Sequence, residues 1–227
     1  MEDKVFFVWG LEIPWLVPVT FFVMAFLTVL GWLATRKMSC DEPGGLQNLM
    51  EAVMEFLLNL VKNSAGEHVM DSFKYIATLF LFILTANMVG LFVPQVNSPT
   101  ASLPVTLGLA ASVLILTVYY GIRNKGLKEY LAHFFKPHWL FFPLNVFELF
   151  IKPLSMALRL FGNIFAGEMM LYILYSIALL YSISALVIWA WQSFSIFIGV
   201  IQAYLFALLA LAYIADAAEK DETEAGS

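Results

Sequence analysis

Long apolar runs separated by short polar segments dominate the chain. A membrane-spanning helix needs about 20 mainly apolar residues, and runs suited to this lie at about 14–34, 75–93 and 106–122. From Met169 to Ala215 the chain has no charged residue, and this stretch is long enough for two helices and a turn. The pattern therefore predicts five membrane-crossing helices.

The segment 46–62 has a different pattern. Its apolar residues recur every three or four positions, and its other face is polar, with Gln47, Asn48, Glu51, Glu55, Asn59 and Lys62. This periodicity is typical of an amphipathic helix that is too polar to cross a bilayer. We expect it to lie on the membrane surface or to pack on a neighbouring helix. The alternative is a helix on the soluble side without contact to lipid.

The breaks between these runs divide the chain, which we expect to form one membrane domain without a soluble domain. The predicted segments are an N-terminal span and breaker (1–43), an amphipathic surface helix (44–72), a helical hairpin (73–122), an interfacial loop (123–143), a second, long hairpin (144–215) and an acidic tail (216–227). The breaker ends in Asp41-Glu42-Pro43, followed by two glycines, a combination typical of turns.

Composition supports the membrane class. The chain has 61% apolar and 13% charged residues, whereas soluble domains carry about 45–50% and about 25%. Such a sequence is too apolar to be disordered, and it lacks the basic character of a nucleic-acid-binding protein. Its single cysteine, Cys40, excludes an internal disulfide and a cysteine-based metal cluster.

The positive charges predict an orientation, because Lys and Arg collect in cytoplasmic loops. In the five-span arrangement, ten of the 12 basic residues fall on one side: Arg36, Lys37, Lys62, Lys74, Arg123, Lys125, Lys128, Lys136, Lys152 and Lys220. Only Lys4 lies on the other side, and Arg159 is left over. We therefore expect the N-terminus outside and the C-terminus in the cytoplasm.

Arg159 has two interpretations from the residues alone. It could snorkel to the interface near the start of a helix whose apolar body begins at Met169. Alternatively it lies within the membrane, where an arginine costs about 2.5–3.5 kcal/mol on insertion scales and normally serves a function. An arginine is a permanent positive charge, which suits it to repel cations or to release a proton from a carboxylic acid.

Four motifs carry a resemblance to a known family. They are KPLSMALRLFGNIFAGE (152–168), IQAYLFALLALAYI (201–214), ANMVGLFVP (86–94) and PLNVFELFIKP (143–153). The first three resemble the family of subunit a of F-type ATP synthases, and the fourth looks most like its chloroplast and cyanobacterial branch and some bacterial relatives. The resemblance begins at about Gly44 and is strongest from Pro143 to Tyr213.

The resemblance implies a fold, a function and partners. The fold is an all-α polytopic membrane protein whose last two helices form a long, tilted hairpin against a ring of c subunits. The function is that of the stator channel of a rotary ATP synthase, in which two aqueous half-channels carry H⁺ or Na⁺ to and from the ring carboxylates. The further partners are peripheral-stalk b subunits and membrane lipid, with no nucleic acid and no cofactor. A bacterial plasma membrane is the expected location, ahead of a thylakoid membrane.

Residue roles follow from the same resemblance. Arg159 separates the half-channels and meets the ring carboxylates, Gln202 is its polar partner on the final helix, and Asn163 is the asparagine one turn after the arginine. Glu168 matches a position of the half-channel on the non-cytoplasmic side. Asn145 and Glu148 match polar positions near the cytoplasmic access route.

Helical spacing adds to these assignments. At 100° per residue one face of the helix carries small side chains and one arginine: Ser155, Arg159, Gly162, Asn163 and Ala166. Glu168 lies about 180° from Arg159, and it should open to the other side of the helix. An interfacial carboxylate is the alternative for Glu168. For Glu148 the alternative is an i to i+4 pair with Lys152.

The position of the last turn separates two arrangements. Arg159 and Gln202 lie at equal depth if the turn is near Leu180–Ser184, and both helices must then tilt steeply, because each arm is about 32 Å long. Hydropathy alone favours a turn near Trp189–Trp191 and two upright helices. We expect the tilted hairpin. Some members of the family carry a histidine seven residues before the glutamine; here that position is Ser195, which cannot titrate.

Two other functions are open on the sequence. A stand-alone secondary transporter could use Asn87, Glu148, Arg159, Glu168 and Gln202 as a solute site, although the inverted repeats common in transporters are not evident. An integral-membrane enzyme could use His133 and His138, but no acidic cluster accompanies them. The choice between H⁺ and Na⁺ is not encoded in a recognisable motif.

Overall fold

The computed structural model describes residues 5–8, 11–36, 45–65, 67–92, 97–135, 138–181 and 185–219. These residues form seven α-helices, three short 3₁₀ helices and one two-stranded hairpin. Five helical stretches are long and apolar enough to cross a membrane. The all-α polytopic class predicted from the sequence is thus confirmed, with the predicted number of spans.

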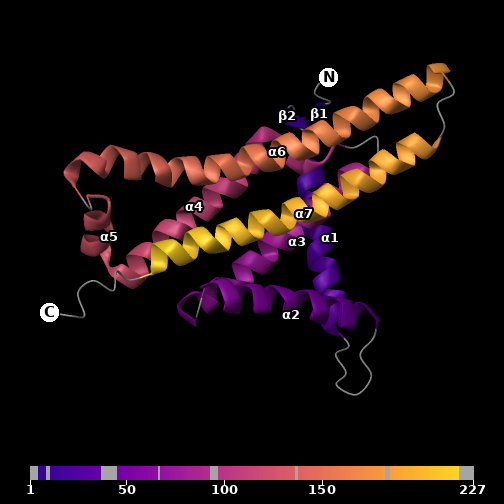
Figure 1. Cartoon of the computed structure of the whole chain (residues 1–227). Coiled ribbons are helices and arrows are strands. Elements are labelled where there is room, and N and C mark those ends of the chain that lie inside the picture. The colour runs from indigo at the N-terminus through magenta and orange to yellow at the C-terminus, as the bar shows by residue number, and fades with distance from the viewer. Residues whose placement is uncertain are drawn as a thin grey trace.

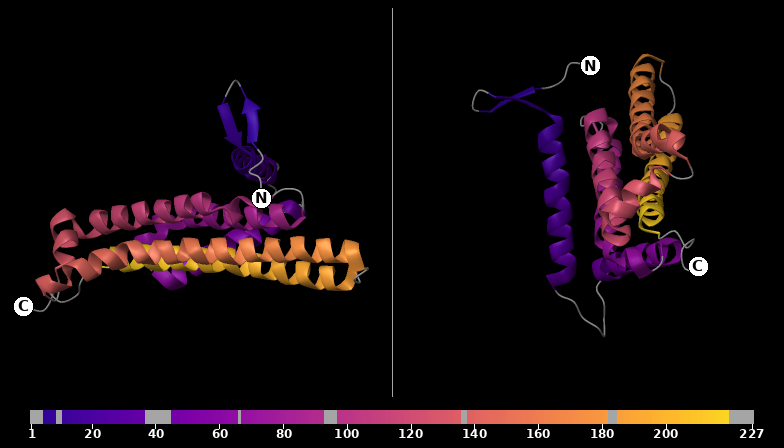
Figure 2. Two further views of the ribbon diagram at one scale, coloured as in Figure 1. Left: turned by 90° about the horizontal axis from the view of Figure 1, so that it is seen from above. Right: turned by 90° about the vertical axis from the view of Figure 1, so that its left-hand side faces the viewer.

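Three spans precede the two longest helices, and the first of them stands upright at one edge of the bundle (Figure 2, right). They are α1 (Leu16–Arg36), α3 (Phe73–Phe92) and α4 (Leu103–Lys125). Helix α1 lies at the edge, and large apolar side chains such as Phe21, Phe22 and Trp32 are exposed on it. In a bilayer this exposure is favourable, because lipid tails are as apolar as the side chains.

Helix α2 (Gly45–Ala65) runs crosswise to α1 at the far end of the bundle from the N-terminal hairpin (Figures 1 and 2). Leu57 and Val61 on its apolar face are fully buried, and the ring of Phe56 lies 5.9 Å from the ring of Tyr204. Most of its polar face, including Glu51, is exposed, whereas Gln47 is buried and donates a 2.7 Å hydrogen bond to Glu51. The predicted amphipathic helix therefore exists and packs on neighbouring helices.

The last two helices are far longer than a bilayer is thick. Helix α6 (Phe142–Tyr181) has 40 residues and α7 (Ala185–Ala218) has 34. At 1.5 Å per residue α6 is about 60 Å long, twice the roughly 30 Å hydrocarbon core. The two run side by side and lie steeply inclined to α1 (Figure 1). Their ends agree with a turn near Leu180–Ser184 and not with one near Trp189–Trp191; residues 182–184 lie outside the described residues.

The core lies where α3, α4, α6 and α7 meet. Ala203, Ala207 and Ala210 of α7 are fully buried, and Phe206 and Met156 are nearly so. Small residues on α7 let neighbouring backbones approach closely, which is the usual means of packing helices in a membrane. Gly199 has the same effect, since a Cβ there would lie 3.4 Å from Asn87 Cβ on α3.

The connection between α4 and α6 is folded against the bundle. Gly126 has φ +84°, a left-handed value that favours glycine, and it leads into α5 (Leu127–His133). The ring of Tyr130 of α5 packs directly against Gly121, and any side chain at position 121 would overlap this ring. Asn145 donates a 2.9 Å hydrogen bond to the carbonyl of Phe134, and η3 (Trp139–Phe141) leads into α6.

A short hairpin precedes the first span, and the sequence did not predict it. Strands β1 (Val5–Val8) and β2 (Leu11–Pro14) pair antiparallel, with Val5 opposite Pro14. Valine and phenylalanine in β1 favour extended backbone. The hairpin lies at the end of the bundle opposite the C-terminal end of α7 (Figure 2).

Candidate functional site

One side of α6 carries two distinct stripes of exposed residues. The small-residue stripe consists of small side chains and one arginine, which share a face as the helical spacing predicts and are all exposed: Ser155, Arg159, Gly162, Asn163 and Ala166. The large-residue stripe beside it consists of Phe147, Leu154, Leu158, Phe165 and Tyr172, also exposed. Bulky apolar side chains suit contact with lipid, whereas small side chains allow another helix to approach closely.

Arg159 lies near the middle of α6, in the small-residue stripe. It is exposed, and it makes no ion pair with any residue that the structure describes. The snorkelling interpretation placed Arg159 near the start of a helix, but α6 already begins at Phe142, 17 residues earlier, so this interpretation loses its basis. A guanidinium in the middle of a membrane helix needs a partner from outside this chain or from water.

Gln202 of α7 contacts the small-residue stripe through Asn163. Its side chain is only 2% exposed, and its Oε1 accepts a 2.8 Å hydrogen bond from Asn163 Nδ2. Asn163 is one turn after Arg159, so Gln202 and Arg159 lie within about one helical turn of each other in depth. This is the register that the tilted hairpin predicts.

Glu168 points away from the stripe, as its angular position predicts. Its Oε1 accepts a 2.8 Å hydrogen bond from the backbone N–H of Ser98. The contact is close enough that a Cβ at Gly90 would overlap both Glu168 Oε1 and Ser98. Helices α3 and α6 and the short helix η2 (Pro99–Ala101) therefore meet around this carboxylate.

A chain of buried polar groups continues from Ser98 to α7. Ser98 Oγ donates to the carbonyl of Ala86 at 2.7 Å, and Thr100 Oγ1 donates to Asn87 Oδ1 at 2.6 Å. Asn87 Nδ2 in turn donates to the carbonyl of Gly199 at 2.8 Å. We name Glu168, Ser98, Thr100 and Asn87 the outer polar cluster. Sequence reasoning missed Ser98 and Thr100; the only signal was their polarity directly after the ANMVGLFVP motif.

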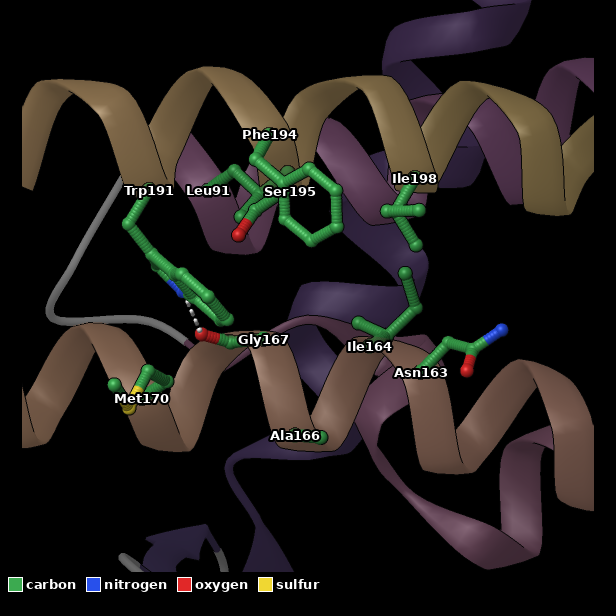
Figure 3. A pocket seen from close by; sticks show the side chains of 10 residues that line it. All are labelled: Leu91, Asn163, Ile164, Ala166, Gly167, Met170, Trp191, Phe194, Ser195 and Ile198. Atoms are coloured by element: carbon green, nitrogen blue, oxygen red, sulfur yellow. Dashed lines mark hydrogen bonds between the residues drawn. The ribbon is translucent and has the colours of Figure 1, made fainter.

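A cavity of about 440 Å³ lies between α6 and α7 (Figure 3). Trp191 borders it and donates a 3.2 Å hydrogen bond to the carbonyl of Gly167. Ser195 is 6% exposed, and its hydroxyl has no hydrogen-bond partner among the residues that the structure describes. Asn163 also lines the cavity, so the cavity reaches from Ser195 to the small-residue stripe. A buried hydroxyl without a partner in a cavity of this size favours occupation by water.

The two residues predicted near the cytoplasmic access route line a second cavity, of about 180 Å³, bounded by α4, α5, α6 and α7. Glu148 forms a 2.8 Å ion pair with Lys152, which is the alternative that its spacing left open. Lys152 Nζ also lies 5.6 Å from the centroid of the Tyr213 ring. Asn145 and Glu148 are thus together, but they are far along α6 from Glu168.

The described residues offer little to a metal enzyme. Within the ranges that the structure describes, no group of three or more His, Cys, Asp or Glu side chains could hold a metal ion. His138 is exposed in the connection before η3.

Comparison with known proteins decides the family. The model of the family described as ATP synthase A chain matches residues 17–215. The chain belongs to this family. The match includes the small-residue stripe, Gln202 and the whole outer polar cluster.

Curated relatives agree with this family. ATP synthase subunit a of Staphylococcus epidermidis is 40% identical over 202 residues, covering 82% of each chain. The protein of the same name from Moorella thermoacetica is 39% identical over 197 residues, covering 87% of each. That of Lysinibacillus sphaericus is 38% identical over 205 residues, covering 85% of this chain and 86% of the relative. These relatives are bacterial; the resemblance to the chloroplast branch stays a prediction.

Proposed function

We propose that the chain is the channel-forming stator subunit of a rotary F-type ATP synthase. The observation that carries the proposal is Arg159. It is an exposed guanidinium in the middle of a membrane helix, without an ion-pair partner in the described part of the chain, on a stripe of small residues and close in depth to the buried amide of Gln202. A ring of helices with membrane carboxylates would supply both the close packing and the counter-charge that this surface lacks.

The two cavities suggest the two halves of the ion path. On the end that carries the N-terminal hairpin, ions would pass the outer polar cluster and the cavity beside Ser195, and then reach the ring at the small-residue stripe. On the opposite end, Asn145 and Glu148 would form the cytoplasmic access. Arg159 lies between the two halves and repels cations that would otherwise cross directly.

The coupling follows from charge and voltage. An ion would bind a ring carboxylate from one half-path, travel with the rotating ring, and leave when that carboxylate meets Arg159. One elementary charge crossing 100 mV releases about 2.3 kcal/mol, so several ions are needed for each ATP. The sequence contains no glycine–lysine nucleotide-binding loop. We therefore place ATP chemistry on other subunits, and this chain is not an enzyme by itself.

The proposal includes partners and an orientation. The partners are the c ring, the b subunits of the peripheral stalk and membrane lipid. The basic residues favour a C-terminus in the cytoplasm and an N-terminus outside, in a bacterial plasma membrane. The transported ion is H⁺ or Na⁺; the ring supplies the ion-binding carboxylate, so its sequence decides between them.

Co-purification tests the assembly. When an affinity-tagged copy of this chain is extracted from its native membrane in mild detergent, we expect the c ring, the b subunits and the ATP-hydrolysing subunits to be recovered with it. A copy that is recovered alone, and that transports a solute by itself in vesicles, would instead support a secondary transporter.

A further inference from the structure

The outer polar cluster contains more oxygen–oxygen contacts than hydroxyl hydrogens. Ser98 Oγ lies 2.7 Å from the carbonyl oxygen of Ala86 and 2.6 Å from Thr100 Oγ1. Thr100 Oγ1 in turn lies 2.6 Å from Asn87 Oδ1. Both end groups are acceptors, because Asn87 uses its Nδ2 to donate to Gly199. Two hydroxyl hydrogens therefore serve three contacts. The two hydrogens can fill any two of these contacts, and one contact is always left without a hydrogen.

The turn at Ser98–Thr100 also holds the carboxylate of Glu168. Ser98 donates its backbone N–H to Glu168 Oε1 at 2.8 Å, and its hydroxyl accepts the backbone N–H of Thr100 at 3.3 Å. The hydroxyl of Ser98 is therefore tied to α3 and to the turn, while its amide is tied to α6. The hydroxyl contacts of Ser98 and Thr100 with α3 thus help to hold the turn that presents this amide. Gly90 completes the arrangement, because a side chain there would occupy the space of the carboxylate.

We infer that Ser98 and Thr100 are positioning residues that fix the carboxylate of Glu168 in the outer half of the ion path. The inference rests on the proposed function, since it assumes that Glu168 takes part in ion transfer. Ser98 and Thr100 are buried, with 1% and 0% exposure, so they act through the turn and not by meeting the ion in bulk water. Removal of the Thr100 hydroxyl leaves Asn87 Oδ1 without this donor and takes away one of the two side-chain contacts, Ser98–Ala86 and Thr100–Asn87, that tie the turn to α3.

Glu168 has no competing ionisable group on the elements packed around it. The stretches 76–118 and 183–203, which include most of α3, η2, most of α4 and the first half of α7, contain no Asp, Glu, Lys, Arg, His, Cys or Tyr. On α6 itself the other charged groups are Glu148, Lys152 and Arg159, which lie towards the opposite end or on the opposite face. Tyr172 and Tyr175 follow Glu168 on α6 and are exposed. Because Thr100→Val and Thr100→Ser leave the ring carboxylates and all other ionisable groups unchanged, a difference in pH profile between the two variants is assigned to the surroundings of Glu168.

The test compares Thr100→Val, which replaces the hydroxyl by a methyl group of similar size, with Thr100→Ser, which keeps the hydroxyl. ATP-driven proton pumping is measured in vesicles bearing the whole complex, over a range of pH on the side opposite the ATP-hydrolysing subunits. We expect Thr100→Val to displace the midpoint of the profile by about half a pH unit or more, since a net hydrogen bond corresponds to a shift of that order. Thr100→Ser should keep the wild-type midpoint.

Three outcomes are decisive. A Thr100→Val complex that is assembled and keeps the wild-type midpoint overturns the inference. An equal displacement by both variants also overturns it, because the hydroxyl would then not be the cause. Glu168→Gln is measured in parallel: if it pumps normally over the whole pH range, it is the proposed role of Glu168 that fails. If Thr100→Val reduces the amount of assembled complex, the profile is normalised to complex content, which leaves the midpoint unaffected.

Discussion

Replacing Arg159 with alanine is expected to reduce ATP-driven proton pumping by about a hundredfold or more, while the complex still assembles. Arg159 is exposed on α6, so its removal leaves no cavity in the core. What is lost is the attraction to a ring carboxylate. Opposite charges 4 Å apart attract by about 4 kcal/mol at an effective dielectric constant of 20, which corresponds to about three orders of magnitude.

The same variant is expected to let protons pass when a gradient is imposed without ATP. Arg159 is a permanent positive charge between the two half-paths, and alanine removes the barrier that keeps them separate. The measurement is proton uptake into vesicles by fluorescence quenching, first with ATP and then with a potassium diffusion potential. Leu158→Ala, on the neighbouring large-residue stripe, is the control and should keep pumping. Normal coupled pumping by Arg159→Ala would refute its proposed role.

Replacing Glu168 with glutamine is expected to reduce pumping by about tenfold or more. Glutamine has the shape of glutamate, and its oxygen can still accept the hydrogen bond from Ser98, so the turn and its packing are kept. The ability to exchange a proton is lost. Between residues 153 and 215 the chain has only one carboxylate, which is Glu168. Ser195, where some family members carry a histidine, cannot take over proton exchange because it does not titrate. General proton-transfer groups contribute on the order of 10²-fold or more.

Glu148→Gln provides the matched comparison. Glu148 is on the same helix, but its side chain is 53% exposed and is paired with Lys152. Exposed pairs of this kind contribute little to stability, and glutamine preserves the polarity of the access route. Because this carboxylate lies in the proposed cytoplasmic access but is open to water, we expect a loss clearly smaller than that of Glu168→Gln. Equal losses in the two variants would indicate that pumping responds to any change of charge on α6 and not to the carboxylate at Glu168.

The spans and the surface helix could be predicted because each depends on local pattern, whereas the last turn was predicted from the family resemblance. The absence of charge from Met169 to Ala215 indicated two helices, and the requirement that Arg159 and Gln202 share a depth placed the turn near Leu180–Ser184. The small-residue stripe followed from the helical period alone. Hydropathy by itself would have placed the turn near the tryptophans, because it carries no information about a helix that crosses the bilayer obliquely.

The outer polar cluster could not be predicted in the same way. Its groups come from α3, η2 and α6, and one of them is the backbone N–H of Ser98, which has no signature in the sequence. The unpaired hydroxyl of Ser195 also depends on packing, since its surroundings are set by α6 and α7 together. The pairing of Glu148 with Lys152, in contrast, is local, and the sequence had offered it as one of two interpretations.

Cysteine cross-linking tests the central claim most directly. Cys40, the only cysteine, is first replaced by serine, and single cysteines are placed at Ser155 and Gly162 on the small-residue stripe or at Leu158 and Phe165 on the large-residue stripe. Each is paired with one cysteine on the carboxylate-bearing helix of the ring subunit, and disulfide formation is measured in native membranes. If the small-residue stripe faces the ring, Ser155→Cys and Gly162→Cys form the disulfide and Leu158→Cys and Phe165→Cys do not. Cross-linking from the large-residue stripe alone, or from neither, would contradict the account.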